Sequence, residues 1–146
     1  MLQFLLVAIF SLSDAMQQVR IVALGDSTTA GTPAFASPLE SPPLGRGDPT
    51  SQYAHWLVQS HPDWEVLNRG VNGERSDQIA ARFGRDVVAA RPAVAVIIAG
   101  VNDIYQGRAA ADVTRYLRQM YEAAAREGSP REKMVRPKDW LAVLGR

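Results

Sequence analysis

The sequence has no cysteine and only two histidines, His55 and His61, among its 146 residues. The lack of cysteine excludes disulfides, thiolate nucleophiles and zinc–thiolate sites, and leaves the redox compartment open. The sequence also lacks an excess of positive or negative charge, because its formal net charge is only +1. The charge balance therefore indicates no nucleic acid or other polyanionic partner.

Long apolar runs are absent as well, since the one at the amino terminus, residues 2–12, is too short to span a bilayer. Its length suits the central region of a secretory signal, and Ser13-Asp14-Ala15 places small residues where a signal peptidase would cut. We therefore expect residues 1–15 to be a signal peptide, no membrane anchor after processing, and a secreted or periplasmic protein. No Lys or Arg precedes the run, so an extra buried segment or a misassigned start, with a cytoplasmic protein, is the alternative.

What is present fits one globular domain, with 47% hydrophobic and 21% charged residues. Runs of apolar, β-branched residues predict strands. Apolar residues that recur every four positions predict helices, and so does a short segment of mixed polar and apolar residues that ends before a proline. Residues 93–99 are continuously apolar, which predicts a central strand buried on both faces. Ser76 is predicted to be an N-cap. The predicted strands are residues 19–24, 64–67 and 93–99, and the predicted helices are residues 52–59, 76–90 and 113–124.

Strands alternate with helices, so the predicted fold is α/β, a three-layer αβα sandwich around a parallel sheet. The pattern stops after Gly128, where the alternation requires another apolar strand and the chain becomes polar instead. Residues 16–128 are therefore predicted to be one incomplete domain and residues 129–146 an atypical tail. Residues 32–49 are rich in proline and predict an irregular loop, a candidate wall of a pocket.

Three loops at the carboxyl ends of successive predicted strands carry the residues that suggest chemistry. They contain Gly25-Asp26-Ser27, the turn ending at Gly73, and Gly100-Val101-Asn102-Asp103. In a parallel sheet such loops meet at one edge. The backbone N–H groups of Ser27 and Gly73 and the side-chain amide of Asn102 would form an oxyanion hole there. Asp26 and Asp103 are expected to support these loops by bonding backbone N–H groups.

These three blocks resemble those of the SGNH (GDSL-type) serine hydrolases, in the same order. The resemblance implies the flavodoxin-like SGNH fold, Ser27 as nucleophile, and Gly73 and Asn102 as oxyanion-hole residues. It further implies hydrolysis of carboxylic esters through an acyl-enzyme, with no metal or cofactor. The substrate would be a small-molecule ester of unknown kind, and the oligomeric state stays open.

The family's fourth block, Asp-x-x-His, supplies the general base and is missing from this sequence. Asp139 is the only late aspartate, and alanine follows it where histidine belongs. His55 and His61 fall in or just after the helix between the first two blocks, so neither corresponds to the catalytic histidine. We therefore expect residual hydrolysis at most, and alternatively a truncated or frameshifted family member or a non-catalytic ligand-binding remnant. Completion by a partner chain that supplies the histidine is a third, weaker alternative.

Overall fold

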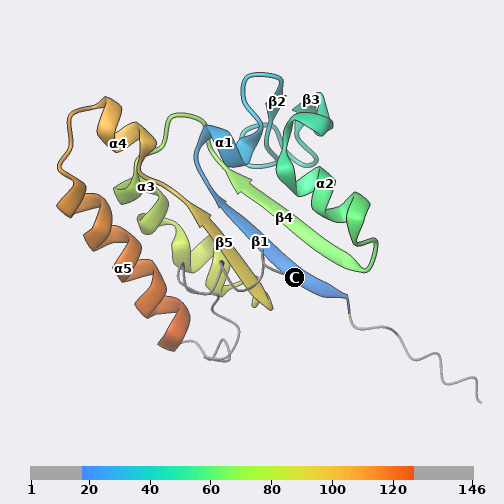
Figure 1. Ribbon diagram of the computed structural model, residues 1–146. Coiled ribbons are helices and arrows are strands. Elements are labelled where there is room, and N and C mark those ends of the chain that lie inside the picture. The colour runs from blue at the N-terminus through green and yellow to red at the C-terminus, as the bar shows by residue number, and fades with distance from the viewer. Residues whose placement is uncertain (1–17, 127–146) are drawn as a thin grey trace, which may run out of the picture.

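The computed structural model describes residues 18–126, which form a three-layer α/β arrangement around a parallel sheet (Figure 1). The sheet has three strands in the order β4-β1-β5. Its strands are β1 (Val19–Gly25), β4 (Trp64–Gly70) and β5 (Val94–Ile98). This confirms the predicted fold class.

β1 lies in the middle of the sheet and brings the other two strands into register at their carboxyl ends. Gly25, its last residue, pairs with Gly70 of β4 and with Ile98 of β5. The apolar residues from Val22 to Leu24 are fully buried. Because all three strands end together, the loops that follow them start at the same edge of the sheet.

Helices cover both faces of the sheet (Figure 1). One face packs against α3 (Ser76–Ala81), the π-helical segment η2 (Gly84–Val88) and α5 (Ala110–Arg126). The other lies beneath α1 (Ser27–Ala30) and α2 (Tyr53–Ser60), the latter preceded by a 3₁₀ turn, η1 (Pro49–Ser51). The main core cluster joins β1 to the first of these layers and contains Val22, Leu24, Ile79, Ala80, Phe83, Val87 and Met120.

The prediction of a central, fully buried strand at residues 93–99 is wrong for the described part of the chain. β5 lies at one edge of the sheet, and its five residues are all partly exposed. An apolar run alone does not distinguish a central strand from an edge strand, because the distinction depends on which strand the chain places next to it. β1, which is mostly apolar but contains Arg20, takes the middle position.

Ser76 is the first residue of α3 and not its N-cap, so that prediction is also wrong. Arg75 occupies the cap position, and the Ser76 hydroxyl donates a hydrogen bond to Asp103, 27 residues away. The predicted helix over residues 76–90 is interrupted between α3 and the wider turn of η2. In α5, Met120 is buried at 1% exposure, whereas the neighbouring Tyr121 is 42% exposed.

Two short features escaped prediction. Residues 32–49 form the expected irregular loop, but it contains a minimal antiparallel hairpin of β2 (Phe35–Ala36) and β3 (Arg46–Gly47). A five-residue helix, α4 (Val101–Tyr105), follows β5 directly. Neither has the length or the periodicity from which a helix or strand is predicted.

The predicted signal peptide, Gly128, the tail at residues 129–146 and Asp139 lie outside the described residues. Within residues 18–126, none of the helices combines the length and the apolar character needed to cross a bilayer.

Candidate active site

Ser27 lies on the tight turn that joins β1 to α1. It is the first residue of that helix and is partly buried. Asp26 precedes it as the N-cap, and its Oδ1 accepts a hydrogen bond from the Thr28 N–H at 3.0 Å. Gly31 closes the short helix by donating its N–H to the Ser27 carbonyl at 3.0 Å. The turn thus holds the serine backbone rigidly at the carboxyl edge of the sheet.

Asp26 is completely buried, which agrees with a supporting role rather than acid–base chemistry in solvent. Its second oxygen, Oδ2, has no hydrogen-bond partner within residues 18–126, and the same holds for the Thr29 and Tyr53 hydroxyls. Burial raises the pKa of Tyr53, and the negative charge of Asp26 raises it further. Tyr53 is therefore a neutral phenol that shares the interior behind Ser27 with the Asp26 carboxylate.

Gly73 presents bare backbone on the turn after β4. Its φ is +77°, which L side chains rarely adopt, and a Cβ added there would meet no atom within 4 Å. The residue is exposed, and its N–H has no acceptor among the described residues. Its backbone N–H is thus available to a bound molecule, as the oxyanion-hole prediction requires.

Asn102 lies in the first turn of α4, after Gly100, whose φ of +119° lets the chain turn sharply out of β5. The Asn102 Nδ2 donates to the carbonyl oxygen of Glu74 at 2.8 Å. A primary amide carries two N–H groups, so this bond fixes the side chain and leaves a second donor. Glu74 directly follows Gly73, so two of the predicted oxyanion donors are linked through one peptide unit.

Asp103 supports the same pair of loops from within. It is fully buried and accepts two hydrogen bonds from Ser76, one from the backbone N–H at 2.8 Å and one from the hydroxyl at 2.7 Å. The carboxylate therefore caps the start of α3 from the neighbouring loop. The expectation that Asp103 bonds a backbone N–H agrees with this geometry, although its partner at the start of the predicted helix over residues 76–90 was not foreseen.

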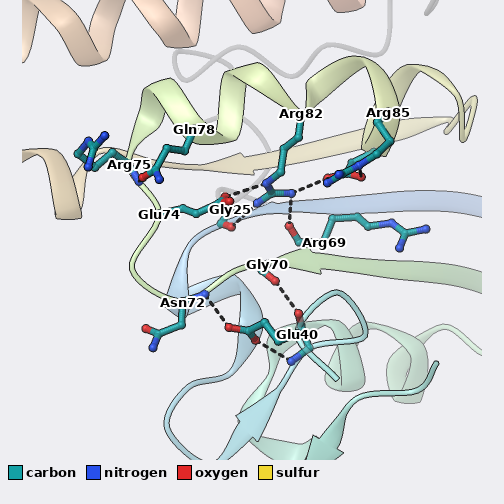
Figure 2. Close-up of polar contacts among 12 residues, drawn as sticks. Gly25, Glu40, Arg69, Gly70, Asn72, Glu74, Arg75, Gln78, Arg82 and Arg85 are labelled. Carbon is teal, nitrogen blue, oxygen red and sulfur yellow. Dashed lines mark hydrogen bonds and ion pairs between the residues drawn. The ribbon is translucent and has the colours of Figure 1, made fainter. Parts of the chain in front are cut away.

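Arg82 is a residue of this region that sequence reasoning missed. Its guanidinium, 8% exposed, contacts the carboxyl ends of β1 and β4 and the loop after β4 (Figure 2). It donates to the carbonyl oxygens of Gly25 and Arg69 and to the carboxylates of Glu74 and Asp86. An arginine at four-residue spacing from an aspartate suggests only an exposed helical ion pair, so no sequence signal separated it from an ordinary surface residue.

Glu40 is a second missed residue, on the loop at residues 32–49. One carboxylate oxygen accepts from the Asn72 N–H and the other from the Ser37 N–H, both at 2.8 Å (Figure 2). Ser37 in turn donates its hydroxyl to the Gly70 carbonyl at 2.6 Å. The loop is thereby attached to the turn that carries Gly73, which places it beside the predicted site.

The two histidines are positioned by packing against tryptophans. His61 is exposed and stacks on Trp64 with ring centroids 3.9 Å apart. Trp64 is the first residue of β4, so His61 lies at the amino-terminal ends of the strands, whereas Ser27 lies at their carboxyl ends. His55 lies in α2 and meets the Trp56 ring edge-on at 5.2 Å.

Comparison with known proteins assigns this arrangement to one family. The sequence profile of the GDSL-like lipase/acylhydrolase family matches residues 23–145. That range contains all three predicted blocks and extends through most of the predicted tail. A search of curated proteins found no match.

Several solved structures share the fold. A protein of the lipolytic G-D-S-L family from Desulfitobacterium hafniense DCB-2 has 25% identity and a TM-score of 0.60, over 73% of this chain and 53% of its own. AlinE4, an SGNH-hydrolase family esterase, has 24% identity and a TM-score of 0.61, over 77% of this chain and 56% of its own. An acetylxylan esterase from Geobacillus stearothermophilus, in a catalytic His-to-Ala mutant, has 23% identity and a TM-score of 0.57, over 76% and 56%. The chain thus spans about half the length of the solved structures it matches.

Proposed function

The chain belongs to the GDSL-like lipase/acylhydrolase family, and from this membership we propose that it acts on carboxylic esters with Ser27 as nucleophile. The Ser27 hydroxyl oxygen attacks the ester carbonyl carbon, and the carbonyl oxygen becomes an oxyanion. The N–H groups of Ser27 and Gly73 and the Asn102 amide stabilise that charge. Loss of the alcohol leaves an acyl-serine, and water then attacks it to release the acid and regenerate Ser27.

The observation that carries this proposal is the bond between the Asn102 amide and the Glu74 carbonyl at 2.8 Å. It joins the second and third loops directly, and the Val71 N–H joins the first and second by donating to the Gly25 carbonyl at 3.0 Å. Donors fixed before substrate binds need no reorganisation in the transition state, and one such donor is worth about 3 kcal/mol. This linkage supports a preorganised oxyanion hole.

The weak point of the mechanism is the proton on the Ser27 hydroxyl. Neither histidine of this sequence corresponds to the family's general base, so the proton would pass to water or buffer, which activates the serine poorly. An oxyanion hole without an intact triad still accelerates hydrolysis by about 10³ to 10⁴ over water. We therefore expect slow turnover rather than none.

Fluorophosphonate labelling tests the nucleophile. Wild type should be labelled slowly at Ser27, identified by peptide mass, and Ser27→Ala should not be labelled at all. Labelling as fast as an intact serine hydrolase would contradict the missing base, and equal labelling of both proteins would contradict the nucleophile.

External imidazole tests the missing base. If Ser27 lacks only a proton acceptor, then imidazole at tens of millimolar should accelerate p-nitrophenyl acetate hydrolysis by wild type more than by Ser27→Ala. The variant corrects for the direct reaction of imidazole with this ester. Equal acceleration in the two proteins would mean that Ser27 is not poised for attack.

A second candidate function is binding of an acyl ester without turnover, which the placement of His61 favours. In that case a slowly hydrolysed ester should bind wild type and Ser27→Ala equally, and no acyl-serine should accumulate. Mass spectrometry of the protein after incubation with the ester separates the two functions.

The predicted signal peptide makes export part of the same proposal. Residues 1–15 would be removed, so the mature chain would start near Met16. Intact mass of the protein recovered from the periplasm or medium of an expression host checks the cleavage, and recovery of the unprocessed chain from the cytoplasm alone would contradict it.

A further inference from the structure

We propose that Arg82 is a positioning residue for the oxyanion hole, because its guanidinium binds the ends of β1 and β4 and reaches the loop after β5 through Glu74. The inference rests on the proposed function, because it concerns the donors that the function uses. Arg82 touches none of the reacting groups itself. Its effect would pass through the backbone of Gly25 and through Glu74 to Asn102.

The guanidinium reaches the ends of β1 and β4 directly, just before the first two loops begin. Its Nη2 donates to the Gly25 carbonyl at 3.0 Å, two residues before Ser27, and its Nη1 donates to the Arg69 carbonyl at 2.9 Å. Gly25 and Arg69 lie at the ends of neighbouring strands, so one side chain spans the sheet where both strands finish. The Gly25 carbonyl also accepts from the Val71 N–H, so this one oxygen links the end of β1 both to Arg82 and to the loop after β4.

The third loop is reached through Glu74. The Arg82 Nε donates to the Glu74 carboxylate at 2.7 Å, and the Glu74 carbonyl accepts from the Asn102 amide at 2.8 Å. Glu74 is therefore held at its side chain by Arg82 while its backbone holds Asn102. Because Gly73 precedes it, a displacement of Glu74 would move both the Gly73 backbone and the Asn102 amide.

Burial and charge make this arrangement strong. Arg82 is 8% exposed and Asp86, which accepts from its Nη1 at 2.8 Å, is 3% exposed. A buried ion pair that loses one partner leaves the other charge uncompensated, so these groups depend on one another. Arginine has several donors in one rigid plane, whereas the lysine ammonium is a point donor that cannot reach two carboxylates and two carbonyls at this spacing.

Arg85 provides a matched control. It lies three residues further along, pairs with the same carboxylate, Asp86, at 2.7 Å, and is 68% exposed. It makes no hydrogen bond to Gly25, Arg69 or Glu74 within residues 18–126. Arg85→Lys thus changes the same chemical group and the same ion-pair partner without touching the site loops.

The experiment compares Arg82→Lys, Glu74→Gln and Arg85→Lys with wild type at a temperature where circular dichroism shows each to be folded. The first readout is the pair of Asn102 side-chain amide protons in nitrogen-15 NMR spectra, identified by their loss in Asn102→Asp. In wild type one proton should be protected by the Glu74 carbonyl. Arg82→Lys should shift both signals and remove most of that protection, whereas Arg85→Lys should leave them unchanged.

The second readout is the fluorophosphonate reaction at Ser27, separated into inhibitor affinity and maximal rate. Arg82→Lys should lower the maximal rate about tenfold to a hundredfold with little change in affinity, since small misplacements of reacting groups cost this much. Loss of stability alone would move neither readout below the unfolding temperature.

If Arg82→Lys does not fold, Glu74→Gln, which weakens only the Arg82–Glu74 bond, replaces it. Unchanged Asn102 amide signals in the folded variant would overturn the proposal. The amide signals do not depend on catalysis, so an unreactive Ser27 would refute the proposed function and leave the positioning result to be decided by NMR.

Discussion

Gly73 and Gly84 differ in backbone conformation although both have space for a side chain. A methyl group would meet no atom within 4 Å at either position, but only Gly73 has a positive φ, at +77°. Alanine at Gly73 should therefore lower the free energy of unfolding by about 1 kcal/mol, because the backbone conformation is strained. Alanine at Gly84 should raise it by about 0.5 to 1 kcal/mol, because it restricts the unfolded chain and favours the helix.

Urea unfolding of the two variants measures both changes, and each serves as the control for the other. A change of the same sign in both would mean that φ does not decide the outcome. Gly73→Ala should in addition slow the labelling of Ser27, whereas Gly84→Ala should not.

Single residues also mark what the sequence could and could not predict of the site. Ser27 and Asn102 each lie three residues after the end of a predicted strand and Gly73 lies six residues after one, so their convergence followed from parallel topology. Arg82 and Glu40 tie the site loops together through hydrogen bonds to residues eight or more positions away, several of them to backbone atoms that carry no sequence signature. Contacts of that kind become visible only in the folded chain.

At the scale of elements, the start of α3 depends on a carboxylate from another loop. Asp103 accepts the N–H and the hydroxyl of Ser76 while fully buried. Asp103→Ala leaves both donors without a partner and should cost about 2 to 3 kcal/mol of stability. Asp103→Asn should cost less, because an amide can accept from the N–H and donate to the hydroxyl.

Thermal unfolding with the two variants side by side checks the order. Equal losses for alanine and asparagine would indicate that the negative charge, and not the pattern of hydrogen bonds, holds α3 to the loop after β5.

Asp86 in the η2 segment is predicted to make the free energy of unfolding depend on pH in the acidic range. Burial alone would raise the pKa of Asp86, but hydrogen bonds from Arg85 and Arg82 outweigh it and lower the pKa below its ordinary value of 3.8. A carboxyl whose pKa is lower in the folded state stabilises the protein fully above the unfolded value and loses that contribution as the pH falls below it.

We therefore expect the free energy of unfolding to fall as the pH drops from about 4 towards the folded pKa. Asp86→Asn should be less stable at neutral pH and should have a flatter dependence over the acidic range. Urea unfolding between pH 2.5 and 6 measures both proteins, and parallel curves would contradict the assignment to Asp86.

At the scale of the whole molecule, the sheet has an edge that no strand covers within residues 18–126. β5 pairs only with β1, and its apolar residues are all partly exposed. Exposed apolar edge strands promote association between chains. We expect concentration-dependent self-association, which sedimentation velocity measures.

Val96→Lys should reduce the association, because a charge on an edge strand opposes pairing. Lysine at a partly buried position also costs stability, so the comparison is made at a temperature where the variant remains folded. A wild type that sediments as a monomer at all concentrations would contradict the prediction.

The fold class followed from the sequence because alternating strands and helices allow few arrangements. Strand order did not follow, since β1 is mostly apolar, β5 is continuously apolar, and either run would suit the centre of a sheet. The interruption after Ala81 was also hidden, because the apolar spacing of Ile79, Phe83 and Val87 continues through the wider turn. The hydrophobic pattern of a sequence thus predicts the layers of the fold well, but it predicts poorly which strands lie next to each other in the sheet.

The loop at residues 32–49 is attached to the neighbouring turn through its own side chains. Glu40 accepts from the Asn72 N–H, and Ser37 donates to the Gly70 carbonyl, so in these two bonds the loop supplies the side chains, and the end of β4 and the turn after it supply main chain. Main-chain atoms are the same whatever residues the turn carries. The loop could therefore be exchanged for that of another protein as a cassette, provided that Ser37 and Glu40 are retained as its anchors. The surface beside Ser27 would then be open to redesign without altering the scaffold beneath it.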